Sequence, residues 1–139
     1  MGKQPRSAPS QRQLRVGELI RHELAEIFTR GDLVDPVVER AGVTVTQVEM
    51  TPDLRLAIAF VRPFRIQAGI AGEALVEALE RHRRFIRGRL SPRLGLKFMP
   101  NLSFRLDTAL DYAEHIDRLL RDPQVARDLA RDQDDDGKE

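Results

Sequence analysis

The stretch VTVTQVEMTPDLRLAIAFV constrains the fold of this 139-residue chain more than any other part of it. Its first part, residues 43–50, is rich in β-branched Val and Thr, which is typical of a strand. In residues 54–61, Leu54, Leu56, Ile58 and Phe60 alternate with Arg55, Ala57, Ala59 and Val61, as the two sides of a strand do. The polar segment 51–53 between the two parts has the chemistry of a tight turn. The stretch therefore predicts a β-hairpin. Its apolar phase shifts between Val45 and Val48, which indicates a bulge or a twist in the first strand.

A helix is expected before the hairpin. Residues 11–30 carry apolar side chains at helical spacing, and Ser10 stands where a residue would cap the first turn. Gly31 and Asp32 then end the helix. Residues 33–42, which contain a Pro and a Gly, are expected to form a connector.

A second helix with two different faces is expected over residues 71–90. Its apolar face carries Leu75, Leu79, His82, Ile86 and Leu90. Arg81, Arg84 and Arg87 fall on the roughly opposite side, so they are expected to face solvent. Ser91-Pro92 and Gly95 are expected to end this helix.

A third strand and a last helix complete the pattern. The strand follows Pro100, with Leu102, Phe104 and Leu106 on one side, and residues 108–122 predict the helix. The order is helix, strand, strand, helix, strand, helix. This order predicts an α+β fold in which helices cover one face of a three-stranded sheet.

Charge is distributed unevenly along the chain. Residues 1–106 hold 18 Lys and Arg against 11 Asp and Glu, a difference of +7, while residues 107–139 hold 5 against 11, a difference of −6. Between Arg81 and Arg105 there are eight basic residues and no acidic one. This asymmetry predicts a basic binding face and an acidic tail, although solvated helix faces are also commonly charged. We expect a flexible basic arm (1–10), one domain (11–121) and an acidic, disordered tail (122–139).

Several function classes find no support in the residues. The chain has no Cys, no apolar run of the roughly 20 residues that a membrane span needs, and no apolar N-terminal segment, so a cytosolic protein is expected. The HELAE segment (22–26) lacks the second His of a zinc-protease motif, and the final DQDDDGKE is too short for a calcium loop. No nucleophile motif or phosphate loop is present. We therefore expect neither catalysis nor a cofactor.

The ordered segments resemble the bacterial ribosome-binding factor A family over roughly residues 11–121. The hairpin stretch is similar to that family's Val/Thr-rich strand, Ser/Thr-x-Asp-Leu turn and Ala-containing second strand. FIRGRL, followed by LGLKFMPNLSFRLDTALDYAEHIDRLL, is similar to its C-terminal half, and RVGELIRHELAEIF suits its first helix. The resemblance implies a type II KH-like fold that binds RNA. It also implies a non-catalytic role, as a monomer on the small ribosomal subunit, in late assembly and in maturation of the 5′ end of 16S rRNA.

One segment departs from the family pattern. The family replaces the KH Gly-x-x-Gly clamp with an Ala-x-Gly kink between two helices. That kink aligns with His82-Arg83-Arg84, where neither the Ala nor the Gly is present. Either the helix runs straighter here or its bend is made in another way, and Arg side chains are expected to supply phosphate contacts.

The candidate RNA-binding residues are all basic, and we expect them to contact phosphates. They are Arg81, Arg83, Arg84, Arg87, Arg89, Arg93, Lys97, Arg12 and Arg15. A protein-interaction module that docks through the last helix and the acidic tail stays open as an alternative. A DNA-binding domain is the third hypothesis, but no Asn or Gln for base recognition stands near RFIRGRL.

Overall fold

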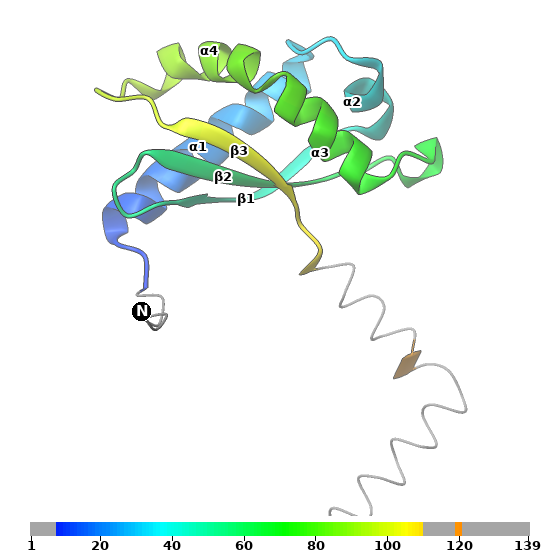
Figure 1. The fold of residues 1–139 in the computed structure, drawn as a ribbon, viewed down its shortest axis with the longest axis horizontal. Helices are drawn as coiled ribbons and strands as arrows, with labels where there is room; N and C mark the ends of the chain where they lie inside the picture. Colours follow the sequence, from blue (N-terminus) through cyan, green and yellow to red (C-terminus); the bar gives the residue numbers. More distant parts are fainter. Residues whose placement is uncertain (1–7, 110–118, 121–139) are drawn as a thin grey trace, which may run out of the picture. The chain divides into compact units, whose positions relative to one another are not determined.

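The computed structural model describes residues 8–109 and 119–120 and contains the predicted hairpin (Figure 1). β1 (Thr44–Met50) and β2 (Leu56–Arg62) pair antiparallel, and their register shifts between Val45 and Gln47, which confirms the predicted bulge. The chain divides into two units, Met1–Leu106 and Asp107–Glu139, and the whole sheet belongs to the first. Most of the predicted arm, last helix and tail lies outside the described residues.

The hairpin turn is fixed by its own side chains. Thr51 Oγ1 and the Arg55 N–H both donate to Asp53 Oδ1, over 2.7 and 3.1 Å. The Leu54 N–H donates to the Thr51 carbonyl over 2.8 Å. Within this network Leu54 adopts a left-handed conformation with φ of 60°, which is uncommon for a residue with a branched side chain.

The third strand, β3 (Asn101–Leu106), pairs parallel with β2, so the sheet order is β1-β2-β3. A parallel pair needs a crossover, and here α3 (Gly72–Arg81) and α4 (Arg83–Leu94) supply it. Glu80 at the end of α3 fastens this crossover to β3, because its Oε1 accepts the Phe104 N–H over 2.6 Å.

The first helix, α1 (Gln11–Arg30), begins and ends where the sequence predicts. Ser10 and Gln13 form a reciprocal capping box, and Gly31 ends the helix in a left-handed conformation with φ of 73°. α1 approaches β1 closely at Gly17, where a Cβ atom would lie 2.6 Å from the Val48 carbonyl oxygen. Glycine is therefore required for this contact between helix and strand.

The core lies between the helices and one face of the sheet. α1 contributes Ile20, Leu24 and Ile27, and β2 contributes Ala57, Ala59 and Val61, all of them completely buried. Leu75, Leu79, Ile86 and Leu90 on α3 and α4 are equally buried, as the apolar face predicted. Leu56, Ile58 and Phe60, on the opposite side of β2, are only partly buried. The predicted α+β class with helices on one face is confirmed.

The connector predicted over residues 33–42 is wrong, because this segment contains helix α2 (Pro36–Ala41). Asp35 caps α2 by accepting the N–H groups of Val37 and Val38, and Pro36 occupies the first turn. The sequence carried this signal, since Asp followed by Pro is a common helix start. A short 3₁₀ helix, η1 (Ile66–Ala68), was also not expected.

Of the two expected stops of the second helix, Ser91-Pro92 is wrong and Gly95 is confirmed. α4 continues to Leu94, and Gly95 follows with φ of 62°. Pro92 removes the donor that would bond the carbonyl of Gly88. The helix tolerates this loss because Gly88 is exposed to water.

The single helix expected over residues 71–90 is interrupted at His82, whose φ and ψ of −101° and 14° separate α3 from α4. His82 Nε2 lies 2.9 Å from Asp35 Oδ2, so the ring donates to the carboxylate that caps α2. Arg81 approaches the same oxygen at 3.8 Å. The break therefore falls where the family's Ala-x-Gly kink aligns, and a His–Asp contact holds it.

Asp35 is buried, yet its pKa is lowered. Burial is the largest influence and raises the pKa, but the hydrogen bonds from His82 and from the Val37 and Val38 N–H groups together outweigh it. A lowered folded-state pKa stabilises the protein above the ordinary value of 3.8, and this stabilisation is lost as the pH falls through the folded-state value.

We predict that Asp35→Asn lowers the free energy of unfolding by about 1–3 kcal/mol at neutral pH, because it removes a charged hydrogen-bond acceptor from a buried position. The difference from the wild type should shrink as the pH falls below 3.8. Asp35→Ala, which also removes the helix cap, should cost about 1 kcal/mol more. Urea unfolding across a pH series measures both effects. A difference that persists unchanged at pH 2 would contradict the role of the ionised carboxylate.

No helix in the described part of the chain is both long enough and apolar enough to cross a membrane.

Candidate nucleic-acid interface

Seven of the nine predicted basic residues form two groups, and the other two lie apart from them. Four lie on the α3–α4 segment: Arg81, Arg83, Arg84 and Arg89. Three line one pocket: Arg12, Arg87 and Lys97. Arg15 is exposed one turn beyond Arg12, and Arg93 lies in the last turn of α4. The basic residues that the sequence placed mainly along one helix therefore belong to a surface to which α1, α3, α4 and the α4–β3 loop all contribute.

The α3–α4 group is exposed, as expected from the sequence. Arg81 has 59% of its side chain exposed, and Arg83 pairs with Glu80 over 3.1 Å at the surface. Arg84 has no hydrogen bond or ion pair with any described residue, and Arg89 lies over the Phe85 ring at 5.3 Å. Surface pairs of this kind are weak, so these groups can turn toward a polyanion at little cost.

Arg87 and Arg93 are instead engaged within the protein. The Arg87 guanidinium donates to the carbonyl oxygens of Met99 and Pro100, over 2.8 and 3.0 Å, and is only half-exposed. Arg93 pairs with Glu23 over 3.1 Å and joins α4 to α1. Arg87 therefore faces solvent less than expected, because two carbonyl groups of the α4–β3 loop bind its guanidinium.

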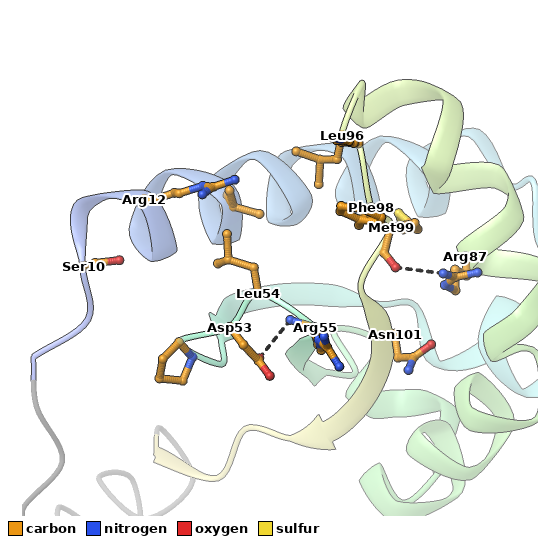
Figure 2. A pocket seen from close by; sticks show the side chains of 13 residues that line it. Ser10, Arg12, Asp53, Leu54, Arg55, Arg87, Leu96, Phe98, Met99 and Asn101 are labelled. Carbon is orange, nitrogen blue, oxygen red and sulfur yellow. Dashed lines mark hydrogen bonds between the residues drawn. The ribbon is translucent and has the colours of Figure 1, made fainter.

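The pocket lies at the tip of the hairpin and has a volume of about 810 Å³. Figure 2 shows side chains from the start of α1, from the hairpin turn and from the α4–β3 loop lining it. We call it the hairpin-tip pocket. Arg55 joins Arg12, Arg87 and Lys97 in its lining, although the sequence did not single it out. The only available signal was its place directly after the turn.

The hairpin-tip pocket carries excess positive charge. Its lining includes four cations and one carboxylate, that of Asp53. The hydrogen bonds from Thr51 and from the Arg55 N–H lower the pKa of Asp53, so its carboxylate is ionised at neutral pH and partly offsets the cations. The balance still favours an anionic ligand.

The described part of the chain contains no candidate metal-binding site. Among residues 8–109 and 119–120, no three His, Asp or Glu side chains gather as metal ligands would. His82, which the sequence placed on the apolar face of its helix, is half-buried and hydrogen-bonded to Asp35.

The basic residues on α3, α4 and the hairpin-tip pocket can together bind an extended polyanion, because proteins hold nucleic-acid backbones through many dispersed cations.

Comparison with known proteins gives a consistent result. A family model described as ribosome-binding factor A matches residues 12–120. Ribosome-binding factor A of Chelativorans sp. (strain BNC1) is 52% identical over 136 residues, which is 96% of this chain and 99% of that protein. The protein of the same name from Rhizobium meliloti (strain 1021) is 47% identical over 97% of this chain and 98% of its own length.

Solved structures are similar as well. The crystal structure of ribosome-binding factor A from Thermus thermophilus superposes with a TM-score of 0.59 at 25% identity, over 70% of this chain and 97% of that one. A homology model of the Thermus thermophilus factor, fitted into an electron cryo-microscopy map of a 30S complex, gives a TM-score of 0.53 at 27% identity, over 66% of this chain and 91% of that one. The fold expected from the sequence, α+β and KH-like, is confirmed by these neighbours.

Proposed function

Since the chain belongs to the ribosome-binding factor A family, we propose that it binds the small (30S) ribosomal subunit and assists late maturation of 16S rRNA, including processing of its 5′ end. The observation that carries the proposal is the family match across residues 12–120. A homology model of the Thermus thermophilus factor was fitted into a map of a 30S complex, which supports the same target. The cation-rich surface is suited to an RNA partner.

The mechanism is stoichiometric binding rather than catalysis. Exposed cations on α3, α4 and the hairpin-tip pocket neutralise phosphates of the precursor rRNA and release counterions. Phosphate contacts fix position without reading sequence, so specificity comes from the shape of the folded rRNA. The protein acts as a monomer in the cytoplasm, needs no cofactor, and leaves when the bound rRNA region reaches its mature conformation.

The proposed division of labour follows the charge. Residues 11–121 form the rRNA-binding domain, residues 1–10 form a basic arm that reaches further phosphates, and residues 122–139 form an acidic tail. The alternative function, a protein-interaction module docking through the last helix and tail, depends on residues that are mostly outside the described part of the chain. No observation favours it.

Depletion of the protein from its own cells tests the processing role. We predict that depleted cells accumulate small subunits whose 16S rRNA carries uncleaved 5′ precursor sequence. Primer extension on rRNA from gradient-purified small subunits measures the fraction of mature 5′ ends. Re-expression of the wild type should restore these ends. Depleted cells with fully mature 5′ ends would contradict the processing role while leaving subunit binding intact.

A further inference from the structure

We propose that the hairpin-tip pocket holds one unpaired nucleotide of RNA, with its base stacked on Phe98 and its phosphates held by the surrounding cations. The inference rests on the proposed function, because it names the part of an RNA partner that this pocket receives. It concerns a site away from the α3–α4 break at His82, since neither His82 nor its neighbours line the pocket.

The floor of the hairpin-tip pocket is apolar. Val16, Leu54, Leu96 and Met99 line it, and all four are partly buried against the hydrophobic core. Figure 2 shows Leu54 on the hairpin turn, with Leu96 and Met99 on the α4–β3 loop. A floor of this kind receives a flat, weakly polar group and repels a fully hydrated ion.

The rim is cationic on several sides. Arg12 comes from α1, Arg55 from the hairpin turn and Lys97 from the α4–β3 loop, and all three are exposed. Arg87 adds a guanidinium whose position is fixed by its two bonds to backbone carbonyls. Cations distributed around an apolar floor match a ligand with a flat body and anionic ends, which describes a nucleotide within a strand.

Phe98 supplies the stacking surface. It has 79% of its surface exposed, more than any other large apolar residue in the described part of the chain. Lys97 Nζ lies 5.7 Å from the centre of its ring. An exposed apolar residue alone is ordinary. An exposed aromatic ring beside a pocket with a cationic rim is the combination that single-stranded nucleic-acid sites use.

The hairpin turn that carries Leu54 supports a binding role independently. Leu54 is the only non-glycine residue with positive φ among the described residues, at 60°. Strained residues of this kind persist where surrounding bonds fix them, and they concentrate at functional sites. Here the Thr51–Asp53–Arg55 network fixes the turn, and the strained residue lines the pocket.

The dimensions favour one unpaired nucleotide. A volume of about 810 Å³ lies within the range of small-ligand pockets, which is on the order of 300–1,000 Å³. A base inside a duplex cannot present its face to a protein ring, whereas an unstacked base in a loop or a linker can. The pocket is therefore suited to an unpaired nucleotide rather than to a base pair.

The test compares Phe98→Ala with a matched control, Phe64→Ala. Phe64 is also exposed, with Arg65 5.2 Å from its ring centre, but it lines a second pocket that shares no residue with the first. The probes are purified small subunits and a single-stranded RNA of about ten nucleotides with a central 2-aminopurine. The same oligonucleotide in a duplex is the third probe. Circular dichroism reports folding, and Phe98→Trp restores an aromatic surface.

We expect Phe98→Ala to weaken binding of the single-stranded probe roughly 5- to 100-fold and to abolish quenching of the 2-aminopurine. The salt dependence should stay unchanged, because no charge is removed. Phe64→Ala should bind as the wild type does, and Phe98→Trp should restore quenching. Equal binding and quenching by wild type and Phe98→Ala, or equal losses in both alanine variants, would overturn the pocket proposal. Failure of the wild type to bind small subunits while Phe98-dependent quenching persists would overturn the proposed function and leave the pocket standing.

Discussion

Gly17→Ala is expected to lower the free energy of unfolding by about 1–3 kcal/mol, even though Ala has the higher helix propensity by about 1 kcal/mol. The new Cβ would lie 2.6 Å from the Val48 carbonyl oxygen, which is a backbone atom held in the β1–β2 ladder. Either α1 moves away from β1 or the strand bends, and both disturb the core around Ile20 and Leu24.

Gly88→Ala is the matched control, because it makes the same substitution in another helix. Nothing lies within 4 Å of the position of its Cβ atom, and Gly88 is exposed. Ala should therefore stabilise the protein by about 0.5–1 kcal/mol. Thermal or urea unfolding of both variants gives the two shifts. The same sign at both positions would contradict the close approach of α1 to β1.

The local features of the fold could be predicted where each signal is complete within a few residues. The Ser10 cap, the Gly31 stop and the bulge after Val45 all depend on adjacent residues, and all are present. Helix α2 carried a comparable signal in Asp35-Pro36, but its length of six residues is too short for hydrophobic periodicity to be evident.

Features that depend on distant partners could not be predicted. The interruption at His82 is held by Asp35, which lies 47 residues earlier in the chain. β2 has apolar residues on both sides, so its pattern did not show that the small Ala57 and Ala59, rather than Ile58 and Phe60, face the helices. Helical spacing predicted that Arg87 faces solvent, but its guanidinium donates to two carbonyl groups of the α4–β3 loop.

The candidate site shows the same limit. Helical spacing correctly predicted that Arg81 and Arg84 are exposed, because exposure on a helix is a local property. The gathering of Arg12, Arg55 and Lys97 around one pocket depends on how α1, the hairpin and the α4–β3 loop meet. The spacing of residues along the sequence does not show that these three segments lie together.

Replacing Arg81, Arg84 and Arg89 together with Gln is expected to leave the fold intact and to weaken binding to small subunits. These three side chains are exposed, and Gln preserves helix propensity and part of the stem. Loss of three phosphate contacts should reduce the slope of log affinity against log salt by roughly 2–3 units. Arg87 is left in place, because its loss would leave the Met99 and Pro100 carbonyls without their donor.

A second triple variant controls for net charge. Arg21, Arg30 and Arg40 are basic residues outside the candidate set, and replacing them with Gln removes the same charge. Arg21 and Arg30 pair with Glu18 and Glu26 on α1, and such exposed pairs contribute little to stability. This variant should retain nearly the wild-type slope. Equal loss in both triple variants would show that net charge, rather than the α3–α4 surface, governs binding.

The most direct test of the central claim is the affinity of the wild-type protein for isolated small subunits and isolated large subunits, measured by co-sedimentation at the same salt concentration. A ribosome-binding factor A that acts on small-subunit assembly should co-migrate with small subunits and should show only weak, salt-labile association with large ones. Comparable affinity for the two subunits would contradict the account, because it would reduce the basic surface to a nonspecific polyanion binder.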